Sequence, residues 1–229
     1  MCIKISARLS QVCTAGHIIR GRGPALAGII GPILFWLALM VLGQTQSAYS
    51  ALRSDISLLS LGANGWIQTV NFVVFGLLVM IFQTGLQRAV APGKAWGALN
   101  ILALAFGLGL LAIAVFPTDR VGTWTVHGII HLGIVVALAL VLPLICLMTA
   151  ARLKPLASWR GYAEFSALIG VVVAVLTVTL LLAWSGIWPA LHPWLGLSER
   201  MVFVLPSLWM EIMALRLLKN VRAGGKSVS

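Results

Sequence analysis

The sequence predicts an all-α integral membrane protein, a bundle of six transmembrane helices with both termini in the cytoplasm. Three observations lead to this fold class. The composition is 60% hydrophobic and 9% charged, whereas soluble domains are roughly 45–50% apolar and about 25% charged. Six apolar segments reach the length of roughly 20 residues that a helix needs to cross a bilayer. Basic residues are concentrated in alternate connections between these segments.

The six segments define one membrane domain with a short basic tail at each end. They are expected as helices at residues 24–44, 66–86, 95–115, 125–150, 162–186 and 198–218. The transmembrane domain is therefore residues 24–218, and the tails are residues 1–23 and 219–229. Apolar residues alternate with basic ones in the first tail, so it is expected either as an amphipathic surface helix or as disordered chain.

The distribution of Lys and Arg predicts the orientation, because cytoplasmic connections retain positive charge. One side of the predicted membrane carries only Arg53, Arg120 and Arg200. The other side carries the remaining thirteen, which are Lys4, Arg8, Arg20, Arg22, Arg88, Lys94, Arg152, Lys154, Arg160, Arg216, Lys219, Arg222 and Lys226. Both termini are therefore expected in the cytoplasm, with the protein in the plasma membrane of a bacterium, the inner membrane.

The same distribution accounts for the net charge of +11 without a nucleic-acid partner. The basic residues form no patch interleaved with aromatic residues, as nucleic-acid binding would require. Cations beside a membrane interact favourably with anionic lipid head groups. Membrane lipids are therefore the expected partners, and the sequence identifies neither a protein partner nor an oligomeric state. The three cysteines are irregularly spaced, which argues against a disulfide framework.

Ionisable groups gather on the predicted outer face. Three of the five acids lie there, each close in sequence to an arginine: Asp55 near Arg53, Asp119 beside Arg120, and Glu199 beside Arg200. The histidines His127, His131 and His192 are predicted on the same face. Ionisable residues near membrane-spanning segments are candidates for a functional site.

His127 and His131 are four residues apart at the start of the fourth segment and share one face of a helix. Two such imidazoles can chelate a metal together with a carboxylate, for which Asp55 and Asp119 are candidates. Zinc is then a possible cofactor, although no cofactor is the preferred expectation. In the alternative, the histidines hydrogen-bond a neighbouring loop, Asp119 caps the next helix, and Gly128 admits a close helix approach.

Other polar residues have structural and functional interpretations. Gln68 and Asn71 share a face of the second segment, where amides either join helices or contact a ligand. Ser57 follows Asp55 in a predicted short helix through Leu61 that the aspartate would cap, and a serine nucleophile would need a histidine within reach. Glu211 lies inside the sixth segment, where it is expected to pair with Arg216 or Gln83, or to be protonated.

Four motifs in order resemble a bacterial membrane family known as domain of unknown function 998. They are Leu52-Arg-Ser-Asp-Ile-Ser-Leu-Leu-Ser-Leu-Gly62, Gly65-Trp-Ile-Gln-Thr-Val-Asn-Phe72, Phe116-Pro-Thr-Asp119 and His127-Gly-Ile-Ile-His131. The resemblance extends over about residues 25–218. It implies a multi-pass membrane fold whose polar signature is Arg53, Asp55, Gln68, Asn71, Asp119, His127 and His131. Glu199-Arg200 stands where the family usually has Gln-Arg.

These observations support three hypotheses of function and leave open whether the protein is an enzyme. The first is a non-enzymatic bundle that binds a lipid or small ligand at the outer polar cluster, or supports a partner. The second is a metal-dependent intramembrane hydrolase that cleaves a lipid amide or ester. The third is a proton-coupled transporter that uses Glu211 and the histidines, although the sequence has no detectable repeat.

Overall fold

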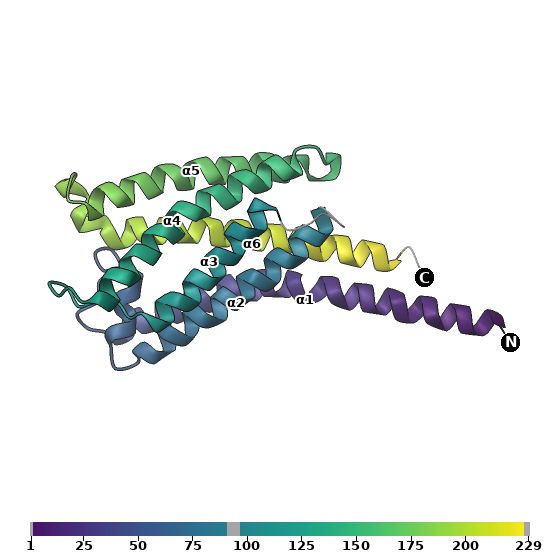
Figure 1. Cartoon of the computed structure of the whole chain (residues 1–229), viewed down its shortest axis with the longest axis horizontal. Coiled ribbons are helices and arrows are strands. Elements are labelled where there is room, and N and C mark those ends of the chain that lie inside the picture. The colour runs from purple at the N-terminus through teal and green to yellow at the C-terminus, as the bar shows by residue number, and fades with distance from the viewer. Residues whose placement is uncertain (1, 91–96, 227–229) are drawn as a thin grey trace.

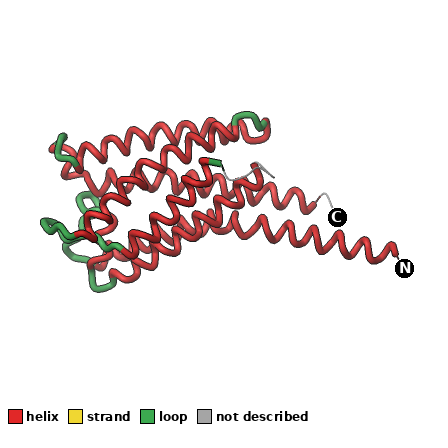
Figure 2. The backbone as a smooth tube through the Cα atoms, in the orientation of Figure 1, coloured by secondary structure: helices red, strands yellow, loops and turns green. Residues whose placement is uncertain are grey.

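The described part of the chain forms six long helices in the computed structural model of the protein, and Figure 1 shows how they are arranged. The structure describes residues 2–90 and 97–226, and within them the side chains of residues 22–90 and 97–220. The helices are α1 (Cys2–Thr45), α2 (Gly65–Val90), α3 (Ala98–Val115), α4 (Val126–Leu153), α5 (Arg160–Trp184) and α6 (Leu195–Lys226). Short 3-10 helices lie in three connections: η1 (Ile56–Leu61), η2 (Ala157–Trp159) and η3 (Pro189–Trp194). The described part of the chain contains no strand (Figure 2).

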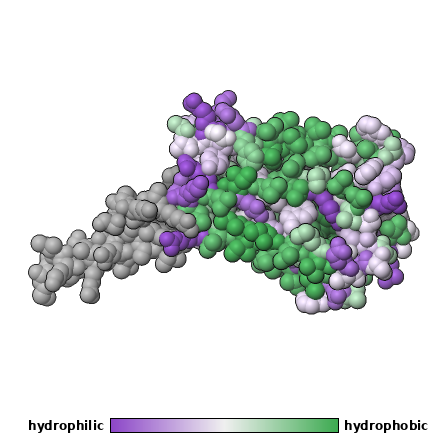
Figure 3. All heavy atoms as spheres, turned by 180° about the vertical axis from the view of Figure 1, so that it is seen from behind, coloured by the Kyte–Doolittle hydropathy of each residue, from purple (hydrophilic) through white to green (hydrophobic). Residues whose placement is uncertain are grey.

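All six long helices are long and apolar enough to cross a membrane, which confirms the predicted class of an all-α, six-helix membrane protein. On the face of the bundle that Figure 3 shows, apolar residues dominate the middle and polar residues gather towards the ends. Large apolar side chains on the bundle surface include Leu37, Ile101, Leu108, Leu168 and Val175. Such a surface is suited to contact with lipid.

The helices pack in chain order, and contacts between α1 and α6 close the ring. Apolar side chains fill the interior, among them Leu42, Phe82, Val173, Leu180, Val202 and Met213. Gly76 of α2 and Gly107 of α3 permit an especially close approach, since a Cβ on Gly76 would lie 2.7 Å from the Gly107 carbonyl oxygen. Small residues at such crossings let membrane helices gain packing contacts.

Successive helices run in opposite directions, so the connections between them alternate between two ends of the bundle (Figure 1). We call one the loop end, formed by the connections 46–64, 116–125 and 185–194, and the other the terminal end, towards which the two chain termini extend (Figure 1). The predicted start of the third helix at residue 95 falls outside the described residues. The chain before residue 24 belongs to α1, which continues as a helix through Pro24 and Pro32.

Candidate functional site

The short helix η1 is fastened at the loop end by two adjacent residues. The backbone N–H of Ile56 donates to Oε2 of Glu199 in α6, at 2.6 Å. The hydroxyl of Ser57 lies 2.8 Å from Nε2 of His131 in α4. Glu199 is 2% exposed and His131 3%, so both bonds are shielded from solvent. The first turn of η1 therefore connects α4 to α6.

The second ring nitrogen of His131 determines which atom donates in the bond to Ser57. Nδ1 lies 2.7 Å from the backbone carbonyl oxygen of Phe116, and a carbonyl can only accept a hydrogen bond. Nδ1 therefore carries the proton, so in the neutral imidazole Nε2 accepts from the Ser57 hydroxyl. A hydroxyl, a base and a group that orients the base are thus arranged as in enzymes with a serine nucleophile.

Asp119 organises the turn before α4. Its two carboxylate oxygens accept from the backbone N–H of Thr125, at 2.6 Å, and from the Thr125 hydroxyl, at 2.7 Å. Thr125 in turn is the N-cap of α4 and accepts from the N–H of Gly128, at 3.1 Å. The expected cap is therefore formed by Thr125, with Asp119 holding it. The two bonds from Thr125 lower the pKa of Asp119.

Gly128 lies against the carboxylate of Asp119. A Cβ on this residue would collide with the side chain of Asp119. The close approach predicted at Gly128 therefore exists, but it serves the turn that leads into α4. A side chain at position 128 would separate Asp119 from Thr125.

A second group of polar side chains surrounds Asp55. Arg200 donates to the backbone carbonyl oxygens of Ser54, at 3.0 Å, and Gly196, at 2.8 Å, and also to the Tyr49 hydroxyl. Asp55 precedes η1 as predicted, but its side chain does not cap the helix. Its Oδ1 atom is buried without a hydrogen-bond partner among the described residues. Burial raises the pKa of Asp55, although Trp184, Arg200 and His192 act in the opposite direction.

The remaining predicted residues have different environments. Arg53 and His127 are exposed, and the ring of His127 faces that of Phe116 with centroids 5.8 Å apart. Asn71 donates to the Phe35 carbonyl oxygen of α1, at 3.1 Å, and to Gln68, at 3.3 Å. Asn71 therefore joins α2 to α1, and Gln68 holds the Asn71 amide. Arg200, and not Arg53, provides the cation that ties the loops to the helices.

The candidate metal ligands are engaged separately. His131 uses both nitrogens to contact Ser57 and Phe116, and Asp119 uses both oxygens on Thr125. Across the described ranges, no three His, Cys, Asp or Glu side chains are grouped so that they could hold a metal ion. The geometry thus does not assemble His127, His131, Asp55 and Asp119 into a zinc site, and we propose no chemistry that depends on one.

Glu211 does not have the partners suggested by the sequence. Arg216 donates instead to the backbone carbonyl of Ser158, at 3.0 Å. Gln83 donates to the side chain of Asn100, at 3.5 Å. Glu211 itself is partly exposed on α6. Because Arg216 and Gln83 bond to other residues, they do not link Glu211 to the polar groups at either end of the bundle. The contacts of these residues therefore give no support to the transporter hypothesis.

Hollows between the helices begin at Ser57 and Glu199. A cavity of about 350 Å³ is lined by these two residues and otherwise by apolar side chains. A second cavity of about 510 Å³, lined almost entirely by apolar residues, shares Phe75 and Phe203 with the first. The two cavities therefore adjoin inside the bundle, and Ser57 and Glu199 lie at the loop-end side of the first.

Sequence reasoning did not identify Ser57, the Phe116 carbonyl and Glu199 as parts of one site. The sequence signals for this site were Ser57, two residues after Asp55, and the charged pair Glu199-Arg200 near the start of the last helix. Sequence spacing could not bring them together, because Ser57 and His131 are 74 residues apart and Ile56 and Glu199 are 143 apart. Every residue has a backbone carbonyl, so the residue type at position 116 cannot indicate that its carbonyl belongs to the site.

Comparison with known proteins identifies the family. The family model described as "Protein of unknown function (DUF998)" matches residues 29–216, and the chain belongs to this family. No curated protein and no solved structure matches the chain. The resemblance found in the sequence motifs is therefore confirmed, and the function has to be inferred from the site itself.

Proposed function

We propose that this protein binds an amphipathic lipid inside its helical bundle, with the polar part of the lipid at Ser57 and Glu199. The observation that carries the proposal is that these two buried polar residues line the same cavity as a set of apolar side chains. A ligand that fits this cavity needs an apolar body and one hydrogen-bonding group. Membrane lipids have this chemistry.

The lining of the cavities supports the proposal. Like typical ligand pockets, the two adjoining cavities combine mainly apolar walls with few polar groups. The Ser57 oxygen and the Glu199 carboxyl group can accept hydrogen bonds from an alcohol or amide group of the lipid.

A cavity-filling substitution tests this proposal. Ala103 of α3 is buried and lines the larger cavity, whereas Ala105 of the same helix is exposed on the outer surface. We expect native mass spectrometry of the wild-type protein, released from lipid nanodiscs, to detect retained lipid. Ala103→Leu should lower the retained fraction, and the matched control Ala105→Leu should leave it unchanged. Equal retention in both variants would contradict the proposal.

A second candidate function, acyl hydrolysis, is favoured by the bond between Ser57 and His131. In this reaction the Ser57 oxygen forms a bond to the carbonyl carbon of a lipid ester, while its proton passes to Nε2 of His131. The bond from that carbon to the leaving oxygen then breaks, and the leaving oxygen takes the proton from His131. Water releases the acyl group by the same steps, so Ser57 and His131 return to their starting states.

Reaction with a fluorophosphonate probe separates this candidate from lipid binding alone. The probe should phosphonylate Ser57 in the folded protein, and Ser57→Ala and His131→Ala should abolish the adduct. Ser54 is the matched control, because its hydroxyl oxygen accepts from the Ser50 N–H and has no bond to histidine. Ser54→Ala should therefore react like the wild type. The absence of an adduct on Ser57 would remove the hydrolase candidate and leave the lipid-binding proposal to its own test.

A further inference from the structure

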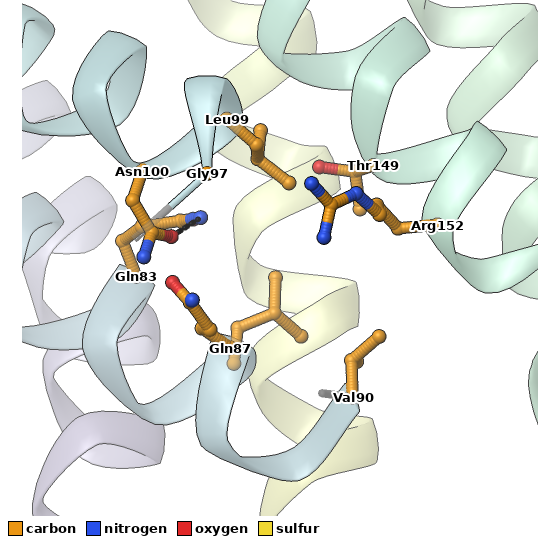
Figure 4. Close-up of a pocket in the computed structure, with 9 residues that line it drawn as sticks. Gln83, Gln87, Val90, Gly97, Leu99, Asn100, Thr149 and Arg152 are labelled. Atoms are coloured by element: carbon orange, nitrogen blue, oxygen red, sulfur yellow. Dashed lines mark hydrogen bonds between the residues drawn. The ribbon is translucent and has the colours of Figure 1, made fainter. Parts of the chain in front are cut away.

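The terminal end contains a polar hollow that is separate from the site at Ser57. It has a volume of about 390 Å³ and lies between the last turns of α2, the start of α3 and the last turns of α4. The lining residues comprise polar Gln83, Gln87, Asn100, Thr149 and Arg152 and the apolar or small Leu86, Val90, Gly97 and Leu99. Arg152 and Gln87 extend into the space between the helices in Figure 4.

The buried amides leave hydrogen-bonding groups unused in this hollow. Gln83 and Asn100 are each 5% exposed, and their one mutual hydrogen bond is 3.5 Å long. This bond uses one N–H group and one oxygen, so the other amide nitrogen and the other amide oxygen have no bond to a described residue. The count is the same if both amide groups are turned over, and it therefore does not depend on which atom is nitrogen.

The other hydrogen-bond donors at this hollow belong to the Arg152 guanidinium and to the N-terminus of α3, both of which are positive. Figure 4 marks no hydrogen bond among the lining residues except that between Gln83 and Asn100, so none joins the guanidinium of Arg152 to them. The N-terminus of α3, at Ala98, adds backbone N–H groups and the positive end of a helix dipole. Thr149 donates to its own helix, at the Ile145 carbonyl. The unused groups are thus mainly donors around one cation, and the described residues that line the hollow include no acid.

We propose that this hollow binds a phosphate group, with Arg152 as its principal anchor and the amides of Gln87 and Asn100 as additional donors. A guanidinium provides paired N–H groups that match phosphate oxygens. The hollow lies within the last turns of the helices, at the depth where head groups meet water. A phosphate group can come from a lipid head group or from a soluble compound, and the test distinguishes the two sources.

Gly97 provides a way to disturb Arg152 without removing its charge. A Cβ on Gly97 would lie 2.7 Å from a terminal nitrogen of the Arg152 guanidinium. The backbone of Gly97 has φ −87°, which any residue adopts, so Gly97→Ala introduces no strain of its own. The new methyl group would displace the flexible end of Arg152 from the hollow, while the net charge stays the same.

The test compares four forms of the full-length protein: wild type, Arg152→Gln, Gly97→Ala and Arg160→Gln. Arg160 is the matched control, because it is exposed at the same end and does not line the hollow. Nanodiscs of phosphatidylcholine alone, or with added phosphatidylglycerol, are analysed by native mass spectrometry for retained anionic lipid. In parallel, the thermal midpoint in detergent is measured with inorganic phosphate against chloride at equal ionic strength.

We expect the wild type and Arg160→Gln to respond alike in at least one of these two experiments. Arg152→Gln should bind roughly tenfold to a hundredfold more weakly, as expected for the loss of a charge-assisted bond, and Gly97→Ala should change binding in the same direction. A response to phosphatidylglycerol alone identifies a lipid head group, and a response to inorganic phosphate identifies a soluble source. No response in the wild type, or equal losses in Arg152→Gln and Arg160→Gln, would overturn the proposal.

Discussion

The charged side chains at the two ends of the bundle make different kinds of contact. At the loop end, Glu199, His131 and Asp119 each have specific hydrogen-bond partners within the fold. At the terminal end, Arg216 lies over the rings of Trp159 and Tyr162, each 5.5 Å from its guanidinium. Buried acids need fixed donors, whereas arginine packs on aromatic faces and keeps other donors available.

This difference predicts that the loop end contributes more to stability per residue than the terminal end. The bonds from Ile56 to Glu199 and from Ser57 to His131 join segments far apart in the sequence and are buried. Substitutions there leave buried partners unpaired, which costs more than the bond itself contributes. Substitutions at the terminal end remove contacts that water and head groups can replace.

The largest loss of stability is expected for Glu199→Ala. Removal of the carboxylate leaves the buried N–H of Ile56 without an acceptor and frees η1 from α6. We expect the free energy of unfolding to fall by about 3 kcal/mol, measured from reversible unfolding in mixed micelles. Glu199→Gln is the control, because its side-chain carbonyl can still accept from Ile56. An equal loss in both variants would show that the charge matters more than the hydrogen bond.

The two histidines of α4 form the next comparison. His131→Ala removes bonds to Ser57 and to Phe116 and leaves a buried cavity, so we expect a loss of about 2 kcal/mol. His127 is exposed, and His127→Ala should change stability by less than about 0.5 kcal/mol. Both values come from the same unfolding assay. Similar losses for the two variants would contradict the assignment of His131 alone to the site.

The sequence predicts the fold class of this protein more completely than its candidate site. Six apolar segments suffice to predict six helices, because in lipid the backbone must satisfy its hydrogen bonds within each helix. The expected spans agree with α1 to α6 to within a few residues, apart from the part of α1 before residue 24 and the part of α6 after residue 218. The predicted orientation of the termini stays a prediction.

Several polar residues of the loop end were singled out from the sequence, but their pairings were not predicted. The family motifs include Asp119, His131, Gln68 and Asn71, all of which take part in structural hydrogen bonds. The partner of His131 could not be predicted, because it depends on how η1 folds back between α4 and α6. The same limit explains why the pair Arg53 and Asp55 and the pair Glu199 and Arg200 looked equivalent in the sequence. In the structure Arg53 is exposed, whereas Arg200 joins the connection 46–64 to α6.

A smaller effect is expected at the terminal end for Arg216→Ala. The substitution removes the contacts with Trp159 and Tyr162 and the bond to the Ser158 carbonyl. Head groups and water can replace much of this interaction, so we expect a loss of about 1 kcal/mol. Arg216→Lys should recover part of it, since the charge stays but the planar stack is lost. A loss as large as that for Glu199→Ala would reverse the comparison between the ends.

The smallest expected effect is a dependence on pH that differs in sign between two aspartates of the loop end. The folded-state pKa of Asp119 is lowered by its bonds to Thr125. Its stabilising contribution is therefore complete above the unfolded value of about 3.9 and is lost as the pH falls through the folded pKa. The pKa of Asp55 is raised by burial. Its contribution is present below about 3.9 and is lost as the pH rises through the folded pKa.

Thermal midpoints of Asp119→Asn and Asp55→Asn, measured against the wild type from pH 3 to neutral pH, test these opposite signs. The disadvantage of Asp119→Asn should shrink as the medium is acidified, because the wild type then loses the carboxylate that holds Thr125. Asp55→Asn should gain on the wild type as the pH rises, because it removes the need to bury a charge beside Glu199. Parallel curves for the two variants would show that the hydrogen bonds from Thr125 do not distinguish Asp119 from the buried Asp55.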